Sequence, residues 1–561
     1  MDAMSPNDPA ALVAAALASK PDLIVHEADR PETVRAVLKV LVQGGNLFDR
    51  GGVLVRLVRS PCGGPPVARQ LTYNNVIVET HQHCQPVKFT ADGNRVAVTL
   101  PDAVARMLLD LGEWGLPPLA GVTTAPLLAA DGSILVRAGY DRAHAMWCEP
   151  VPDLTVPIQP TRAEAEAALL LLRTAFRSFP FSGSPMVTCG EIMVVDISKP
   201  PSPAESAFLA ALQTACCRAS LLLAPGVLIV APEVSGAGSG KGLLVRAISL
   251  IGFGCAPSAF TPGHDRQELD KRLVAALIEA CPAVFLDNLN STSLRSNTLA
   301  SVLTERPAHV RVMGRSEMVP LNCAAFVAVT GNGLSVSEDL ARRFLEVLLD
   351  PQCEDPEARP FPTGFLNNIL SRRTELLAAV LTIWRWGRQN PAGLRRGLPL
   401  GSFETWAEWV RDPLLTLGCG DPVERVRAAK ANDPRRRRTA ELFATWWEHH
   451  NKQPVTAAEL AEPARVLIDP QGRGRQFVAS RLMQMDGTRA GGFVLSRQPA
   501  AGKWGAATYV VAQTAPEATD GIGHRDHREH PHETAVSSPP MPPMDPMPYA
   551  GGDADEMEGE L

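Results

Sequence analysis

A strand candidate, a glycine-rich turn, a lysine and a helix candidate follow one another without interruption between residues 226 and 254. The apolar run GVLIVA favours a buried strand, and LLVRAISLIGFG, after the lysine, favours a helix. In this context glycines let backbone N–H groups converge on phosphate oxygens, while the helix start and the lysine add positive charge. The segment therefore predicts a nucleotide-binding loop in an α/β domain.

Two positions of this loop depart from the pattern GxxxxGK[ST]. Ser235 stands where the first glycine is usual, and Gly242 stands where a Ser or Thr hydroxyl usually holds Mg²⁺. A glycine-rich turn with an incidental lysine is the alternative, and the downstream motifs at the expected spacing argue against it. The residues expected to bind ATP are Ser235, Gly236, Gly238, Ser239, Gly240, Lys241 and Gly242.

Three further strand candidates, AVFLDN, FVAVTGN and LEVLLD, alternate with helices, as is typical of a parallel α/β sheet. The first ends in Asp287, which we expect to contact the Mg²⁺ of bound nucleotide, with a strand-end cap as its alternative role. The next residue, Asn288, can orient a water but cannot take its proton. Asn332, at the end of the second strand, is expected to position the attacking water. The nearby carboxylates that could act as the base are Glu233, Glu268 and Glu317.

The segment SEDLARRF predicts a helix that carries Arg342 and Arg343. One of them is expected to complete the site of a neighbouring subunit and to stabilise transition-state charge, with an ordinary solvated helix face as the alternative. Before it, two short alternating runs around residues 314–316 predict a β-hairpin with a basic tip, which would face the pore of a ring. Its candidate DNA contacts are Arg311 and Arg315.

The set SGAGSGKG, VFLDN, hairpin, VTGN and DLARRF resembles the motifs of superfamily 3-type AAA+ primase-helicase ATPases of phages, plasmids and integrated elements. The likeness extends to PPLAGVTTAPLLAADGSIL–GYD and FPF upstream and to GSFETWAEWVRDPLLTLG downstream, so it covers most of the chain except its first residues and its tail. The resemblance implies a ring-forming ATP hydrolase that moves along DNA. Residues 1–200 carry no primase catalytic signature, so priming is not implied.

The C-terminal part predicts a winged helix. TAELFATWWEHHNKQPVTAAELAEPARVLI favours two helices, GRGRQFVASRLMQM a third, and GGFVLSR and ATYVVA two strands. A basic third helix can enter a groove of duplex DNA, although winged helices also serve as protein-contact modules. The expected DNA contacts are Arg473, Arg475 and Lys503, and Arg481, Arg489 and Arg497 could also meet phosphates.

Length and charge complete the expected organisation. With 561 residues the chain is long enough for several domains, and its net charge of −6 means that any nucleic-acid surface must be local. We expect a multidomain α/β protein made of an α+β N-terminal accessory domain (1–200), an AAA+ ATPase core (201–350), a helical lid segment (351–432), a winged helix (433–513) and a disordered tail (514–561).

Several classes of protein are excluded by local patterns. The longest apolar run, 221–234, is too short and too broken by prolines to span a bilayer, and the N-terminus has no basic stretch before an apolar core. Eleven cysteines without a CxxC pair favour reduced thiols, so we expect a soluble cytoplasmic protein. His81, His83 and Cys84 raise a metal hypothesis, but they lack a second ligand pair, and TYNNVIVETHQHCQPVKF alternates like a strand.

These features favour a DNA-dependent ATPase, a replicative helicase of a phage, plasmid or integrated element that couples ATP hydrolysis to translocation on DNA. Its expected cofactors are ATP and Mg²⁺. Its expected partners are single-stranded DNA in the pore, duplex DNA at the winged helix and further copies of the chain, a hexamer being one option. The alternatives are an AAA+ loader or remodeller that acts on a protein, and a nucleotide-binding DNA scaffold with little hydrolysis, which the departures at Gly242 and Asn288 keep open.

Overall fold

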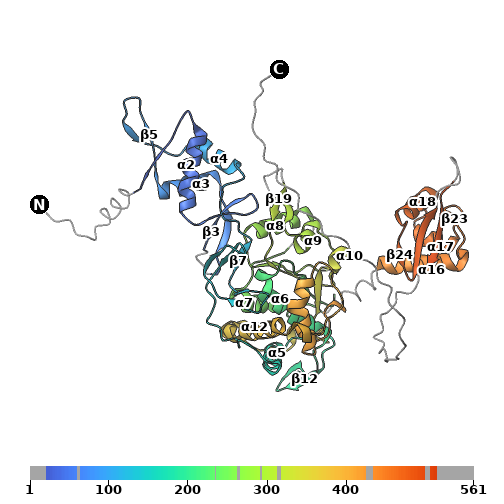
Figure 1. The fold of residues 1–561 in the computed structure, drawn as a ribbon. Helices are drawn as coiled ribbons and strands as arrows, with labels where there is room; N and C mark the ends of the chain where they lie inside the picture. The colour runs from blue at the N-terminus through green and yellow to red at the C-terminus, as the bar shows by residue number, and fades with distance from the viewer. Residues whose placement is uncertain are drawn as a thin grey trace, which may run out of the picture. The chain divides into compact units, whose positions relative to one another are not determined.

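The chain is a mixed α/β protein of more than one part (Figure 1). The computed structural model describes residues 20–59, 64–233, 236–261, 266–290, 293–312, 318–424, 434–498 and 506–514. It contains two compact units, a larger unit (Met1–Glu441) and a C-terminal unit (Leu442–Leu561). None of the helices in the described ranges combines the length and the apolar character needed to cross a membrane.

A five-stranded parallel sheet forms the centre of the larger unit, with strand order β15–β16–β20–β14–β22. Its strands are β14 (Gly226–Ala231), β15 (Ala259–Phe260), β16 (Ala283–Leu286), β20 (Phe326–Asn332) and β22 (Phe344–Leu348). In the register, Leu228 lies opposite Val329 and Phe285 lies opposite Ala328. The four strands predicted from the sequence are confirmed.

Both faces of this sheet are covered, which explains why its strands are apolar at successive positions. Val227 and Ile229 of β14 pack into one core, and Leu228 and Val230 pack into another on the opposite face. Helices α8 and α9 and the hairpin strands β18 and β19 cover the second face. The bounds are α7 (Lys241–Phe253), α8 (Arg266–Ile278), α9 (Asn297–Thr304), β18 (Ala308–Arg311), β19 (Met318–Leu321) and α10 (Glu338–Ala341), with a two-strand pair of β17 (Ser293–Leu294) and β21 (Ser335–Val336).

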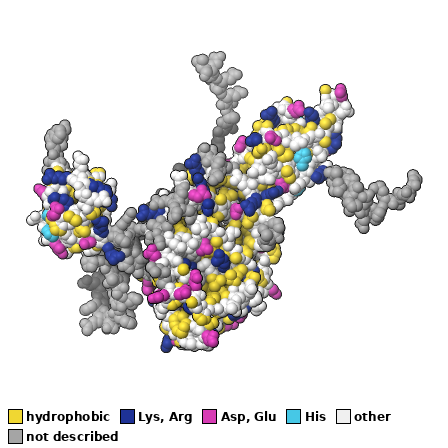
Figure 2. All heavy atoms as spheres, turned by 180° about the vertical axis from the view of Figure 1, so that it is seen from behind, with side chains coloured by type: hydrophobic (Ala, Val, Ile, Leu, Met, Phe, Trp, Pro, Cys, Tyr) yellow, Lys and Arg dark blue, Asp and Glu magenta, His cyan; other side chains and the backbone are white. Residues whose placement is uncertain are grey.

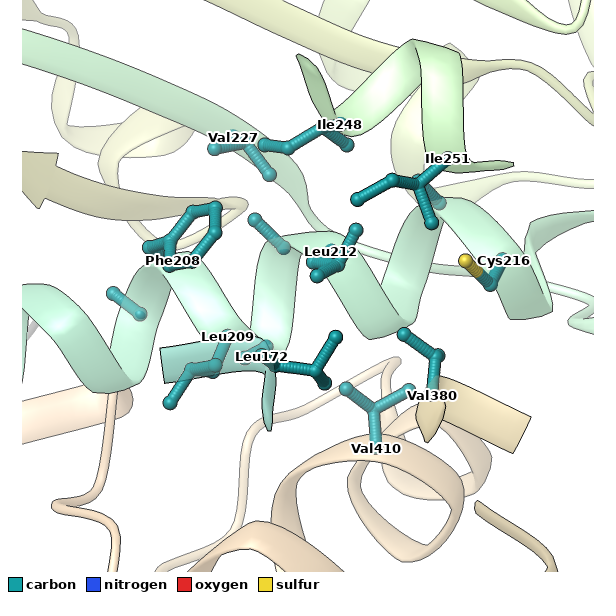
Figure 3. Close-up of a cluster of buried hydrophobic side chains, with 14 of the residues drawn as sticks. Leu172, Phe208, Leu209, Leu212, Cys216, Val227, Ile248, Ile251, Val380 and Val410 are labelled. Carbon is teal, nitrogen blue, oxygen red and sulfur yellow. The ribbon is translucent and has the colours of Figure 1, made fainter. Parts of the chain in front are cut away.

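Helix α6 (Pro203–Cys217) is the centre of the first core and is buried on almost all sides. Figure 3 shows Phe208, Leu209, Leu212 and Cys216 among side chains of neighbouring helices and of β14, such as Leu172, Val227, Ile248, Ile251, Val380 and Val410. A helix that is apolar all round is stable only inside a core. Its one buried carboxylate, Glu205, is paired with Arg173 at 2.7 and 3.1 Å.

A helical segment follows the sheet and packs against α5 (Arg162–Phe176), α6 and α7. It contains α11 (Phe365–Ser371), α12 (Arg373–Gln389), α13 (Glu404–Trp406), a π-helical turn (Ala407–Arg411) and α14 (Asp412–Thr416). Trp384 and Trp406 are fully buried, and the Trp406 Nε1–H donates to Thr214 Oγ1 at 2.8 Å. The helix predicted at TELLAAVLTIWRW is confirmed as α12.

The N-terminal part of the larger unit consists of short strands and three helices. A core of its own lies between the helices and the sheet β1–β5–β6. The elements of this part are β1 (Asp22–Ile24), α2 (Arg30–Gln43), β2 (Leu47–Asp49), β3 (Leu54–Val58), β4 (Val67–Gln70), α3 (Tyr73–His83), β5 (Gln85–Phe89), β6 (Arg95–Ala97), α4 (Asp102–Asp110), β7 (Gly121–Thr123), β8 (Leu127–Leu128), β9 (Ile134–Leu135), β10 (Gly139–Asp141) and β11 (Met146–Cys148). After α5 follows the pair β12 (Met186–Cys189) and β13 (Ile192–Val195), and Val195 packs into the first core.

The strand predicted for TYNNVIVETHQHC is wrong, because Tyr73–His83 forms helix α3. Thr72 and Asn75 make a reciprocal capping box: Thr72 Oγ1 accepts from the Asn75 N–H at 3.3 Å, and Asn75 Oδ1 accepts from the Thr72 N–H at 3.1 Å. Such a cap starts a helix even where the sequence alternates like a strand. His81 lies in this helix and accepts a hydrogen bond from the Leu100 N–H at 3.2 Å, which gives it a structural role.

The N-terminal part is joined to the central sheet by backbone and side-chain contacts. The Ala68 N–H donates to Glu279 O at 2.8 Å, and the Val122 N–H donates to Ala280 O at 3.2 Å. Arg50 is 2% exposed, and its guanidinium donates to Leu119 O at 2.8 Å and to Leu277 O at 3.0 Å, near the end of α8. Burial lowers the pKa of Arg50 to about 10. These contacts hold β4 against α8.

The C-terminal unit contains helices on an antiparallel sheet of order β23–β26–β25–β24. Its core includes Phe443, Trp446, Leu482, Leu495 and Val511. The helices and strands predicted from the sequence are confirmed. The bounds are α16 (Pro434–His450), β23 (Val455–Thr456), α17 (Glu462–Ile468), α18 (Arg475–Gln484), β24 (Arg489–Ala490), β25 (Phe493–Gln498) and β26 (Thr508–Gln513). From residue 515 on, the predicted tail lies outside the described residues.

Candidate nucleotide-binding site

Three of the predicted site residues lie at the carboxyl edge of the parallel sheet. The glycine-rich loop (232–240) follows β14 and leads to Lys241, Asp287 follows β16, and Asn332 ends β20. Because β20 lies between β14 and β16, these strand ends are neighbours. Ligands of α/β proteins bind at this edge of the sheet.

The loop has a backbone that requires glycine. Gly238 and Gly240 have φ angles of 73° and 91°, in the left-handed region. At Gly236 a Cβ atom would come within 2.1 Å of Pro232 O. No side chain caps the start of α7 at Gly240, so the first N–H groups of the helix are not used by a capping residue. Such a helix start suits an anion. Ser235 lies outside the described residues.

Lys241 folds back onto the loop. Its Nζ donates to Gly236 O at 2.6 Å and to Ser239 Oγ at 3.1 Å, both neutral oxygens. Ser239 is 1% exposed, and its own hydroxyl donates to Gly236 O at 2.9 Å. Burial lowers the pKa of Lys241, and the nearby charge of Asp287 acts in the opposite direction. A phosphate could therefore replace neutral partners of a partly desolvated ammonium group.

Asp287 is held by neighbours on two elements. The Thr330 hydroxyl of β20 donates to Asp287 Oδ1 at 2.6 Å, and the Asn288 N–H donates to Thr330 Oγ1 at 3.1 Å. On the other side, Arg246 Nη2 of α7 lies 3.7 Å from Asp287 Oδ2. The carboxylate thus has a fixed position and a cationic neighbour.

The residues present fit Mg²⁺ only in part. A carboxylate oxygen is a suitable ligand, and Asp287 supplies it. At Gly242, however, the hydroxyl is missing, and a Cβ there would lie 3.7 Å from Asp287 Oδ1 and 2.8 Å from Arg246 Nη1. The guanidinium of Arg246 therefore lies where a Ser or Thr side chain would approach Asp287.

A network of asparagines links the ends of β16 and β20. Asn290 Nδ2 donates to Asn288 Oδ1 at 2.6 Å, and the Asn332 N–H donates to Asn290 Oδ1 at 2.9 Å. Asn332 Oδ1 is buried and has no hydrogen-bond partner among the described atoms. A Cβ on Gly236 would lie 2.6 Å from this oxygen, so the Asn332 amide contacts the loop with an unsatisfied polar atom.

The candidate bases are placed differently. Glu233 begins the loop, and its side chain lies against Gly333, next to Asn332. Glu268 pairs with Arg272 at 2.9 Å on α8. Glu317 lies outside the described residues. Of the two described carboxylates, Glu233 is the one that contacts the residue after Asn332.

The two arginines after α10 differ in exposure. The predicted helix is shorter than expected, since α10 ends at Ala341, and both arginines follow it. Arg342 is 62% exposed and donates to Asp339 Oδ1 at 2.6 Å. Arg343 is 14% exposed, pairs with the other oxygen of Asp339, and has a buried Nε without a partner among the described atoms. Only Arg342 presents its guanidinium to solvent.

The predicted hairpin is present as strands β18 and β19, in antiparallel register from Ala308–Leu321 to Arg311–Met318. Arg311 is exposed at the end of β18. It lines a cavity of about 350 Å³ together with Arg69 of β4, Lys271 of α8 and Glu279, which pairs with Arg69. Arg315 falls in residues 313–317, outside the described residues.

Basic side chains also lie on the surface of the C-terminal unit (Figure 2). Arg473 and Arg475, before and at the start of α18, are exposed. The Arg473 guanidinium stacks on Phe477 with 4.6 Å to the ring centroid. Lys503 lies outside the described residues.

Three residues near the loop were not identified from the sequence. Arg246 could have been found, because it lies four residues after Gly242 and so shares its helix face. Thr330 was noted only as part of a strand. No pattern in the sequence pointed to Glu357. It lies in a short turn after β22, and its side chain contacts Gly238.

No protein-family model matches the chain, and no curated protein matches its sequence. It is similar to solved structures of the NrS-1 C-terminal region in an apo form, of a JCV helicase with a bound compound, and of the Cch helicase of SCCmec type IV. The identities are 13%, 14% and 12%, and the TM-scores are 0.32, 0.20 and 0.27. The matches cover 85%, 41% and 84% of this chain and 98%, 59% and 98% of those chains. At TM-scores this low the structural similarity is no argument about function. The function is therefore argued from the residues of the site.

Proposed function

We propose that this protein is a DNA-dependent ATPase of the superfamily 3-type AAA+ class, a ring-forming replicative helicase of a phage, plasmid or integrated element. The observation that supports it most is the convergence of Lys241, Asp287 and Asn332 at one edge of the parallel sheet. A positive helix start, a lysine with neutral partners and an unsatisfied amide suit a nucleoside triphosphate and an attacking water.

Each residue has a proposed role. When nucleotide binds, the Lys241 ammonium group replaces its hydrogen bonds to Gly236 O and Ser239 Oγ with bonds to phosphate oxygens. Asn332 positions the attacking water, and Glu233, which lies against Gly333, takes its proton. Asp287 is the residue that would hold Mg²⁺ if the ion joins the bound nucleotide, and the ion would then neutralise phosphate charge during hydrolysis.

Two surfaces are proposed to meet DNA. Arg311 and the basic residues around the cavity near β18 would contact single-stranded DNA in the pore of the ring. The C-terminal unit, as a winged helix, would contact duplex phosphates through Arg473 and Arg475. Stimulation of the ATPase by single-stranded DNA and binding of duplex DNA would then depend on different residues.

The test is the ATPase rate of the full chain with and without single-stranded DNA, combined with a strand-displacement assay. Lys241→Ala should abolish turnover. Arg311→Ala should keep basal ATPase, weaken DNA stimulation and lower the salt slope of single-strand binding by about 0.7. Arg475→Ala should weaken binding of duplex DNA and leave the stimulation of ATPase by single-stranded DNA unchanged. A wild-type protein that hydrolyses ATP with no response to DNA would refute the helicase proposal.

A second candidate is a nucleotide-binding DNA scaffold with little hydrolysis. The absent hydroxyl at Gly242 and the amide of Asn288 in place of a carboxylate favour it. It predicts stoichiometric ATP binding with negligible product formation, whereas the helicase proposal predicts DNA-stimulated phosphate release. Glu233→Gln separates the two, because it should slow hydrolysis only if hydrolysis occurs.

A further inference from the structure

The carboxylate and the arginine beside the loop form a pair at the position where a P-loop protein normally holds its metal ion. Arg246 lies one turn after Gly242 on α7, and its Nη2 is 3.7 Å from Asp287 Oδ2. Asp287 is fixed from the other side by Thr330 at 2.6 Å. A guanidinium thus lies between the helix start and the acidic residue.

Gly242 is the residue that makes this arrangement possible. A Cβ at this position would be 2.8 Å from Arg246 Nη1, closer than a side-chain carbon can approach without displacing the guanidinium. A Ser or Thr would therefore both move Arg246 and place a hydroxyl near Asp287. Two features therefore occur together: the hydroxyl that would bind a metal is absent at Gly242, and the guanidinium of Arg246 lies near Asp287.

We propose that Arg246 supplies the positive charge that Mg²⁺ supplies in other P-loop proteins, so that this loop binds ATP without a divalent cation. The inference rests on the proposed nucleotide-binding function and concerns the recognition of the phosphates. With Lys241 and Arg246 opposite the single carboxylate of Asp287, these three residues carry a net charge of +1 before any metal binds. An arginine has five N–H donors and never loses its proton at neutral pH, so it can bind phosphate oxygens while remaining near Asp287.

The experiment measures ATP affinity by isothermal titration calorimetry on the full chain, in excess EDTA and in magnesium chloride. Wild type should bind ATP in EDTA nearly as tightly as in Mg²⁺. Arg246→Ala should weaken binding in EDTA by roughly 10- to 100-fold, the range for a hydrogen bond to a charged group, and should keep binding in Mg²⁺. Arg246→Lys should retain part of the EDTA binding because it keeps the charge.

Two further variants make the test specific. Gly242→Ser should displace the guanidinium, add the missing hydroxyl and make ATP binding depend on Mg²⁺. The matched control is Arg372→Ala, which removes an arginine of similar exposure (31%, against 37% for Arg246) that is paired with Glu375 at 2.8 Å. It should bind ATP like wild type in both buffers. Circular dichroism spectra and thermal midpoints verify that each variant is folded.

Three results are informative. If wild type binds ATP only in Mg²⁺, or if Arg246→Ala binds equally well in EDTA, Arg246 is merely a charge partner of Asp287 and the inference is refuted. If no ATP binds in either buffer, the proposed nucleotide-binding function itself fails. If Gly242→Ser leaves EDTA binding unchanged, the guanidinium does not act from the position beside Asp287.

Discussion

Replacing Arg342 tests whether the ATPase site is completed by a neighbouring subunit. Arg342 is 62% exposed and its contact is with Asp339, at 2.6 Å on the same segment. An exposed ion pair of this kind contributes about 1 kcal/mol or less to stability, so Arg342→Ala should fold normally. An arginine that stabilises transition-state charge is worth about 10³–10⁵ in kcat, equivalent to about 4–7 kcal/mol. The variant should therefore lose turnover without losing stability.

Arg343→Ala is the matched comparison, because the two arginines share Asp339 and differ in burial. Arg343 is 14% exposed and leads directly into β22. Its removal should lower the free energy of unfolding by about 1–3 kcal/mol, as for other partly buried paired groups, and should reduce turnover only in proportion to the folded fraction.

Subunit mixing provides the decisive assay. A ring interface is heterologous, so one subunit offers the loop and the next offers the arginine. In an equal mixture of Arg342→Ala and Lys241→Ala subunits, about a quarter of the interfaces combine an intact loop with an intact arginine. ATPase activity should recover to about that fraction of wild type. Wild-type turnover in Arg342→Ala alone, or rings that form on mixing with no recovery, would show that Arg342 does not act between subunits.

Three other predictions follow from particular contacts. Glu205→Ala leaves buried Arg173 uncompensated and should destabilise the larger unit by about 3–5 kcal/mol in urea unfolding, whereas Glu205→Leu with Arg173→Met should cost much less. Gly226→Ala would place a Cβ 2.5 Å from the Phe344 ring and should lower stability by about 1–3 kcal/mol, measured in the same way. Burial lowers the pKa of Lys241, and a bound phosphate would raise this pKa. The affinity for ATP should therefore be constant at low pH and should fall as the pH rises through the lowered pKa of Lys241 in the free protein. An ATP affinity that stays constant through and above that pH, or the same fall in affinity in Lys241→Arg, would contradict it.

Local patterns were sufficient for the elements around the loop. GVLIVA, AVFLDN and FVAVTGN could be recognised as strands because continuous apolar runs of this length are typical of strands that are covered on both faces. The loop could be located because its glycines occur between such a strand and a helix, and Gly238 and Gly240 do adopt the left-handed backbone that glycine permits. These inferences need only the chain near each residue.

Other features were misjudged because the residues at the start or end of an element outweigh the periodic pattern inside it. The residues Tyr73–His83 alternate like a strand, yet the side chains of Thr72 and Asn75 cap a helix. The segment with Arg342 and Arg343 has a helical pattern, yet the chain must leave the helix early because β22 begins at Phe344. In both places a local preference is overruled by the geometry at the end of an element.

The order of residues along the chain specifies which chemical groups the site can use: the residues that can hold phosphate, the acid that follows a strand, and the absence of a hydroxyl at position 242. Which of these groups lie close together depends on the packing of the folded chain. The strand order places β20 between β14 and β16, which brings Asn332 and Asp287 to the loop. It also brings the guanidinium of Arg246 against a carboxylate 41 positions later in the chain, at 3.7 Å. The spacing of residues along one chain specifies helices and strands, but the distance between two elements is set by how their apolar faces pack, and that depends on the whole fold.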